Sequence, residues 1–342
     1  MVGMTGVVRY MLLSVVCLVV LIGCEQEHDA ESDLALWQVS QAETGWPRSI
    51  QTEQGRLTLT QPPKRIVSTS VTLTGTLLAI NAPVIATGGT MANTDVAGEY
   101  GFMRQWESVA KQRKLIPLYQ TEANAEAIVE ARPDLIIISA TGGDSARKLY
   151  AQLKDIAPTL IIGYDDKSWM QLASIFGQFL GLEKQAQTVI SQFEQDVQKT
   201  KDMIQLPPQP TTAMVYYQDN TGGNIWTHES AQGQLLTELG FQLAEVPDSV
   251  KGDNSMGQRN DIIIATGERF PDAITGQSVL LFAAAKERVK GFIHTPYLQA
   301  TQAVKNHQVY AVGNDTFRLD YYSATNLLHR LQTLFGQSKH AN

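Results

Sequence analysis

The residues best suited to bind a ligand lie near the end of the chain, in the segment NDTFRLDYYSA at 314–324. It places Arg318 between Phe317 on one side and Tyr321 and Tyr322 on the other. A guanidinium group pairs with oxyanions and also lies over aromatic rings, so this set suits a ligand that is both anionic and aromatic. The competing interpretation is a surface arginine beside a helix whose tyrosines face the protein core.

The sequence gives little support to catalysis. It contains no G-x-S-x-G motif, and apart from His28 every histidine lies in the second half of the chain, without the pair spacing of metal ligands. The glycine-rich segment SATGGDSA at 139–146 lacks the lysine of a P-loop, and we interpret it as a tight strand-to-helix turn. We therefore predict that the protein is not an enzyme and has no catalytic residue, no protein-ligated metal and no cofactor.

The overall charge of the chain bears on whether it binds nucleic acid. The 342 residues carry a formal net charge of -7, and no basic stripe or basic tail interrupts them. Nucleic acid is therefore excluded as a partner. The length is sufficient for one large domain or for two lobes with their own cores.

Two stretches of alternating strands and helices predict the elements that hold these residues. Between 65 and 164 short apolar runs alternate with helical segments, and PDLIIIS at 133–139 is almost continuously apolar, as in a strand buried on both faces. The alternation restarts after the prolines of PPQP at 207–210. Between the two stretches, the segment at 183–206 has no glycine or proline and carries an apolar stripe, which predicts one long helix.

The predicted fold class is α/β, with two Rossmann-like lobes of mostly parallel sheet joined by one long α-helix. The N-terminal lobe covers 46–182, the connecting helix 183–206 and the C-terminal lobe 207–338.

Ligands of parallel α/β sheets bind outside the carboxyl ends of the strands, so we expect the site in the cleft between the lobes. Loops at those ends hold Trp226, in NIWT, and Arg318. Arg104, in GFMRQW, belongs to a first-lobe segment that can reach the same space.

The N-terminal segment is not part of the two predicted lobes. Arg9 is followed by an apolar run at 10–22, which is too short to span a bilayer and is typical of a signal peptide. The run ends in LIGC, which resembles a bacterial lipobox, so we expect a lipoprotein signal peptide at 1–23 with lipid attached to Cys24. The acidic segment at 24–45 is interpreted as a tether. The alternative is an ordinary signal peptide with an incidental cysteine.

The two predicted lobes share a weak sequence similarity. Glu126 and Glu268 each precede a helix-like segment that is followed by a buried strand. The alternative interpretation is that both are solvated residues in the first turn of a helix, where a carboxylate favours the helix dipole.

Several of these segments resemble a known family. PKRIVSTSVTLTGTLLAI, SATGGDSA, IAPTLIIGYDDKSW, WTHESAQGQLL and TFRLDYYSA are similar to segments of the periplasmic ferric-enterobactin-binding proteins of catecholate-siderophore importers. The resemblance extends over 46–335 and implies the class III periplasmic-binding-protein fold, in which two lobes joined by a helix close only slightly on binding.

The resemblance also implies a function. The chain is expected to be the substrate-binding component of an ABC importer, a lipid-anchored monomer of the periplasm that delivers a ferric catecholate siderophore to an inner-membrane permease and its ATPase. Iron is expected to be carried by the siderophore. The positions that match the family's ligand contacts are Arg104, Trp226, Phe317 and Arg318. Those that match its permease-docking glutamates are Glu126 and Glu268.

Two alternatives remain at this point. One is a different cargo in the same class, such as haem, a hydroxamate siderophore or cobalamin. The other is an envelope esterase that cleaves the siderophore, which needs a nucleophile beside a base, although the first lobe contains no histidine.

Overall fold

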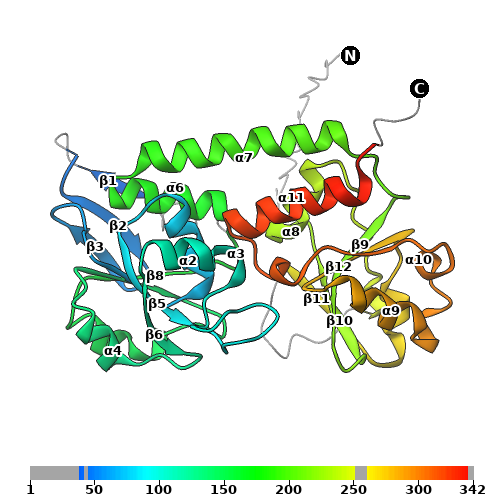
Figure 1. The fold of residues 1–342 in the computed structure, drawn as a ribbon, viewed down its shortest axis with the longest axis horizontal. Coiled ribbons are helices and arrows are strands. Elements are labelled where there is room, and N and C mark those ends of the chain that lie inside the picture. Colours follow the sequence, from blue (N-terminus) through cyan, green and yellow to red (C-terminus); the bar gives the residue numbers. More distant parts are fainter. Residues whose placement is uncertain (1–37, 42–44, 251–259, 338–342) are drawn as a thin grey trace, which may run out of the picture.

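Two five-stranded β-sheets, one in each half of the chain, dominate the structure, a computed structural model that describes residues 38–41, 45–250 and 260–337. Figure 1 shows the sheets side by side in separate lobes, with one long helix, α7 (Glu183–Met203), lying across both. The predicted fold class, two α/β lobes joined by a long helix, is confirmed.

The first-lobe sheet has the strand order β6-β5-β4-β7-β8, and all neighbouring strands are parallel. Every residue of β7, which lies between β4 and β8, is buried, as the continuous apolar run at 133–139 predicts for a strand covered on both faces. The strands are β4 (Ile66–Ser68), β5 (Val84–Gly89), β6 (Ile116–Gln120), β7 (Leu135–Ser139) and β8 (Thr159–Ile162). The helices are α2 (Val71–Ala79), α3 (Arg104–Gln112), α4 (Ala125–Glu130), η1 (Arg147–Leu149), α5 (Tyr150–Leu153) and α6 (Trp169–Leu180).

A small antiparallel sheet precedes this lobe and is absent from the sequence-based expectation. It consists of β1 (Val39–Gln41), β2 (Arg48–Thr52) and β3 (Gly55–Leu59). Strand β1 lies within the segment 24–45 that we expected to be a tether, so the structured part of the chain begins earlier than predicted. The sequence of β1 is only three residues long, too short to show a strand pattern.

The second-lobe sheet has the strand order β11-β10-β9-β12-β13 and is mixed, because β10 runs antiparallel to both of its neighbours. The strands are β9 (Thr211–Tyr216), β10 (Gly222–Trp226), β11 (Ile262–Thr266), β12 (Ser278–Phe282) and β13 (Val309–Ala311). The helical segments are α8 (Ala231–Glu238), η2 (Asp248–Val250), η3 (Gly267–Ala273), α9 (Lys286–His294), η4 (Pro296–Leu298), α10 (Gln302–Lys305), η5 (Asn314–Thr316) and α11 (Tyr321–Phe335).

Strand β10 corrects the prediction that NIWT lies in a loop. A turn at 217–222, in which Asn220 has the left-handed value φ 62° and its N–H donates to the Tyr217 carbonyl at 3.1 Å, folds the chain into a β9–β10 hairpin. Trp226 is the last residue of β10.

Helix α7 is shorter than the predicted 183–206, because the chain becomes extended at Ile204, before the first proline. Its apolar stripe is buried, and it packs against α6 and α11. Figure 1 shows α11, in red, lying beside α7 and running from the middle of the molecule toward the second lobe. At the start of α11 the ring of Tyr321 meets that of Trp169 at 5.4 Å, and at its end Phe335 meets Tyr310 at 4.8 Å.

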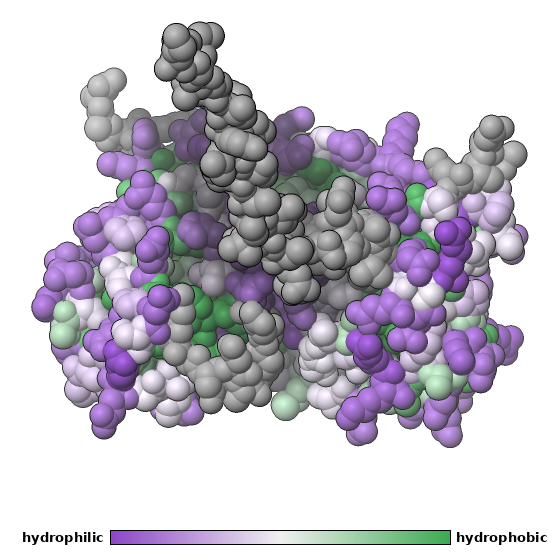
Figure 2. Space-filling view, turned by 180° about the vertical axis from the view of Figure 1, so that it is seen from behind, coloured by the Kyte–Doolittle hydropathy of each residue, from purple (hydrophilic) through white to green (hydrophobic). Residues whose placement is uncertain are grey.

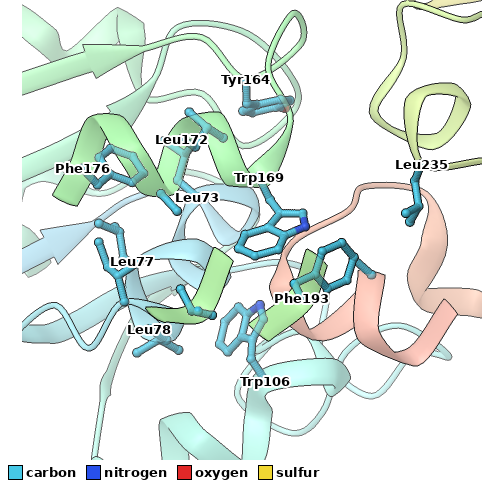
Figure 3. Close-up of a cluster of buried hydrophobic side chains, with 14 of the residues drawn as sticks. Leu73, Leu77, Leu78, Trp106, Tyr164, Trp169, Leu172, Phe176, Phe193 and Leu235 are labelled. Atoms are coloured by element: carbon cyan, nitrogen blue, oxygen red, sulfur yellow. The ribbon is translucent and has the colours of Figure 1, made fainter. Parts of the chain in front are cut away.

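One hydrophobic cluster therefore includes side chains from both lobes. It contains Leu73 of α2, Trp169 of α6, Phe193 of α7, Leu235 of α8 and Leu327 of α11. Figure 3 shows Trp169 beside Phe193 at the centre of this cluster, and their rings meet edge to face at 5.0 Å. Because the two lobes share this core, a large rotation of one against the other would expose apolar surface to water.

The opposite face of the molecule appears in Figure 2, where hydrophilic residues cover most of the described surface of both lobes. Hydrophobic residues gather toward the middle, on the half that holds the second lobe. Among the described residues, no helix combines the length and the hydrophobicity that a membrane span requires.

Candidate ligand-binding site

A cavity of about 590 Å³ lies between the two lobes. Its first-lobe wall comes from segments that follow the carboxyl ends of β4, β7 and β8, the edge where ligands of parallel sheets bind. First-lobe lining residues are Thr72, Gly142, Tyr164, Asp165, Lys167 and Leu172. Those from the second lobe are Tyr217, Asn224, Trp226, Ala231, Gln232, Asp261, Ile262, Ile264, Thr266, Phe317, Arg318 and Leu319.

Three of the four predicted ligand contacts meet in this cavity: Trp226, Phe317 and Arg318. The rings of Trp226 and Phe317 lie edge to face, 5.8 Å apart. Trp226 is almost buried, whereas Phe317 is 41% exposed although it is large and apolar. Nε1 of Trp226 is buried and has no hydrogen-bond partner within the described part of the chain. Of this pair, the ring of Phe317 is the one open to a ligand.

Arg318 crosses from the second lobe to the first. Its Nη1 donates hydrogen bonds to Oγ1 of Thr72 at 2.6 Å and to Oδ1 of Asp144 at 3.1 Å. The guanidinium carbon lies 4.8 Å from the ring centre of Tyr164 and 5.8 Å from that of Phe317. The side chain remains 30% exposed, so an incoming ligand can reach it.

Asp144 accepts hydrogen bonds from several donors in addition to Arg318. Ser70 Oγ donates to its Oδ2 at 2.5 Å, Thr72 donates to Oδ2 from both Oγ1 and the backbone N–H, and Tyr164 donates to Oδ1 at 3.0 Å. Burial would raise the pKa of Asp144, but the charge of Arg318 and the bonds from Ser70 and Thr72 outweigh burial and hold that pKa below its usual value. The carboxylate is therefore ionised at neutral pH.

Sequence reasoning missed Asp144, because it treated SATGGDSA only as a turn. Gly142 explains the shape of that turn: its φ is +87°, and a Cβ at this position would lie 1.8 Å from the hydroxyl of Tyr164. The only signal in the sequence was that this loop follows a buried strand and so lies at the cleft.

Lys167 is a second cation in the cavity wall that the sequence did not reveal. Its side chain is 8% exposed and its Nζ lies 2.6 Å from Oδ1 of Asp166. Asp165 also lines the cavity, and its Oδ2 accepts a hydrogen bond from Thr141. The wall thus combines both signs of charge.

Arg104 is not in this cavity. It is the first residue of α3 and lines a neighbouring hollow of about 510 Å³ that also contains Asp315 and Arg330. Its Nε and Nη2 donate to the carbonyl oxygen of Thr94 at 3.0 and 2.8 Å. The next residue, Gln105, lines a further hollow of about 470 Å³ together with Arg318.

The predicted docking glutamates lie on different lobes, and both are exposed. Glu126 is in the first turn of α4, where its N–H donates to the side chain of Asn124. Glu268 is in η3, a 3-10 segment that contains Pro271. Cys24 and the signal peptide lie outside the described residues.

Two α/β lobes that share a connecting helix and enclose a cavity lined by arginine and aromatic side chains define a substrate-binding protein. The chain belongs to the family described as periplasmic binding protein, whose model matches residues 66–316.

Relatives of known function agree with this family. The chain is 53% identical over 290 residues, 85% of this chain and 91% of the relative, to the ferric enterobactin-binding periplasmic protein FepB of Escherichia coli O6:H1. The crystal structure of holo-ViuP is similar with a TM-score of 0.77 and 32% identity, covering 85% of this chain and 96% of that one. The Staphylococcus aureus SirA complex with staphyloferrin B has a TM-score of 0.63 at 20% identity, covers 83% and 97%, and shows the common fold.

Proposed function

We propose that this chain is the substrate-binding component of an ABC importer and that it binds a ferric catecholate siderophore of the enterobactin type between its lobes. The observation that carries the proposal is its 53% identity, across 91% of the relative's length, to a ferric enterobactin-binding periplasmic protein.

The chemistry of the cavity supports this cargo. A ferric tris-catecholate is anionic and presents aromatic rings, and the cavity offers a guanidinium at Arg318 beside the open ring of Phe317. Ile262 and Ile264, which belong to the same lobe as Phe317, add apolar wall. A volume of about 590 Å³ falls within the range of roughly 300–1,000 Å³ that is usual for small-molecule sites.

The protein binds the complex intact in this proposal. The siderophore keeps the iron, and the protein supplies no iron ligand, no cofactor and no catalysis. Within the described residues, no group of three or more histidine, cysteine or acidic side chains is arranged to hold a metal ion. Esterase activity is the alternative outcome, and release of dihydroxybenzoyl-serine from the cargo would reveal it.

Arg104 can contact the ligand only if its side chain moves. In its present conformation the guanidinium is bonded to Thr94, outside the cavity that contains Arg318. We keep it as a ligand contact on the ground of the family match, which requires its side chain to leave Thr94 when ligand binds.

The same proposal covers the partners. Glu126 and Glu268 are exposed, one on each lobe, which supports the proposal that they contact the two halves of a permease driven by its ATPase. We further propose that the protein acts as a monomer, tethered in the periplasm by lipid on Cys24.

Tryptophan fluorescence titration of the purified domain tests the choice of cargo. Trp226 lines the cavity, so a bound ferric catecholate should quench its emission. Ferric enterobactin is expected to bind more tightly than haem, cobalamin or a ferric hydroxamate. Tighter binding of any of these three would replace the proposed cargo.

A further inference from the structure

The contacts between Arg318 and Asp144 join segments that are far apart in the sequence and belong to different lobes. Asp144 follows β7 of the first lobe, whereas Arg318 precedes α11. The Asp144 side chain is 13% exposed, and its Oδ1 lies 3.1 Å from Nη1 of the guanidinium. Thr72 supports the same contact, since its Oγ1 accepts from Arg318 and donates to Asp144.

The guanidinium uses only one of its nitrogens in these contacts. Nη1 makes both hydrogen bonds to the first lobe. Nε and Nη2 have no hydrogen-bond partner among the described residues. A Cβ on Gly142 would lie 3.1 Å from Nη2 and 1.8 Å from the hydroxyl of Tyr164, so glycine at this position lets both groups lie against the loop.

We propose that Asp144 is the positioning residue for Arg318: together with Thr72 it fixes Nη1 on the first lobe and so holds Nε and Nη2 ready for the oxygens of an anionic ligand. The arginine is thereby ordered before the ligand arrives. Ordering a long side chain costs affinity when binding has to do it, so prior ordering strengthens binding. This inference deepens the proposed function and rests on it for the identity of the ligand.

A simpler role for Asp144 makes the opposite prediction. If the carboxylate only neutralises the guanidinium, its removal frees the positive charge, and Arg318 then contributes more to the binding of an anion. If the carboxylate positions the guanidinium, its removal leaves the Arg318 side chain disordered, and Arg318 then contributes less to the binding of an anion. The sign of the coupling between the two residues separates the two roles.

A double-mutant cycle with Asp144→Asn and Arg318→Ala measures that sign. It is carried out by fluorescence titration with ferric enterobactin. We expect Arg318→Ala to weaken binding at least about tenfold in the wild type but less than about threefold in the Asp144→Asn background. An equal or larger loss in that background would overturn the positioning role.

A second measurement needs no ligand, so its failure is distinguishable from failure of the proposed cargo. NMR relaxation of the Arg318 Nε–H, assigned by its loss in Arg318→Lys, reports the order of the guanidinium in the free protein. We expect an order parameter of roughly 0.8 in the wild type and below roughly 0.6 in Asp144→Asn. Equal order in both proteins would overturn the inference even if ferric enterobactin binds.

Thr72 provides a second variant in case Asp144→Asn folds poorly. Thr72→Val keeps the shape but removes the hydroxyl that links Arg318 to Asp144, and is expected to lower the order of the Nε–H. Thr72→Ser keeps the hydroxyl and is expected to preserve it. If Thr72→Val leaves the order unchanged, the hydroxyl does not hold the guanidinium, and the proposed arrangement is wrong.

Discussion

Replacing Arg318 by alanine is expected to weaken binding of ferric enterobactin about tenfold to a hundredfold. A hydrogen bond to a charged group contributes roughly 1.5–3 kcal/mol, and each 1.4 kcal/mol corresponds to a factor of ten in affinity. Nε and Nη2 have no protein partner in the described structure, so at least one such bond to the ligand is available. The side chain is 30% exposed, which places the loss toward the lower end of this range at high salt.

Arg318→Lys is expected to recover only part of the loss. An ammonium group keeps the charge but lacks the planar fork, so it cannot contact Asp144 and the ligand with separate nitrogens. It also stacks less well on the ring of Tyr164, which lies 4.8 Å from the guanidinium carbon. Alanine at Trp226 or Phe317 should weaken binding with little change in salt dependence, because these residues contribute contact area.

The assay is fluorescence titration of each variant at two ionic strengths. Arg147→Ala is the matched control, because it removes one positive charge from a half-exposed arginine that pairs with Glu53 and does not line the cavity. Arg104→Ala asks whether that side chain leaves Thr94 for the ligand. Equal affinity of wild type and Arg318→Ala would refute the reasoning, as would an equal loss in Arg147→Ala.

Three further predictions concern the fold, the permease and the anchor. Burial raises the pKa of Asp320 from 3.8 to about 6, so its proton stabilises the folded state at low pH, and up to about 3 kcal/mol of stability is lost as pH rises through 6. Asp320→Asn, which still caps α11, should therefore gain stability relative to wild type between pH 4 and 7 in thermal unfolding, and a pH-independent difference would contradict this. Glu126→Arg with Glu268→Arg should abolish uptake while ligand binding in vitro stays normal; growth of that double variant on ferric enterobactin as sole iron source would contradict the docking role. Cys24→Ser should release the protein from washed membranes with unchanged ligand affinity, and its retention there would contradict lipid attachment.

Much of the fold could be predicted because its signals are local. The buried strand at 133–139 is apolar at almost every position, and the long helix contains no residue that breaks a helix. Strand β10 could not be predicted in the same way. Its sequence, GGNIW, begins with two glycines and has weak strand character, and only its pairing with β9 and β11 makes it a strand.

Site residues could be predicted where the residue types themselves indicate ligand binding, as an arginine beside a phenylalanine does at Arg318. Its partner Asp144 could not, because the contact between them spans 174 positions and depends on how the lobes pack. A contact within the first lobe places Arg104 outside the cavity. Its segment belongs to the first lobe as expected, but the hydrogen bonds to Thr94 turn the guanidinium toward a different hollow.

Anomalous diffraction from iron in crystals grown with ferric enterobactin tests the central claim most directly. We predict one iron site in the cavity between Trp226 and Arg318, surrounded by six catecholate oxygens, with Nε or Nη2 of Arg318 donating hydrogen bonds to those oxygens. Iron bound by protein carboxylates, or a siderophore seated in the hollow beside Arg104, would contradict it.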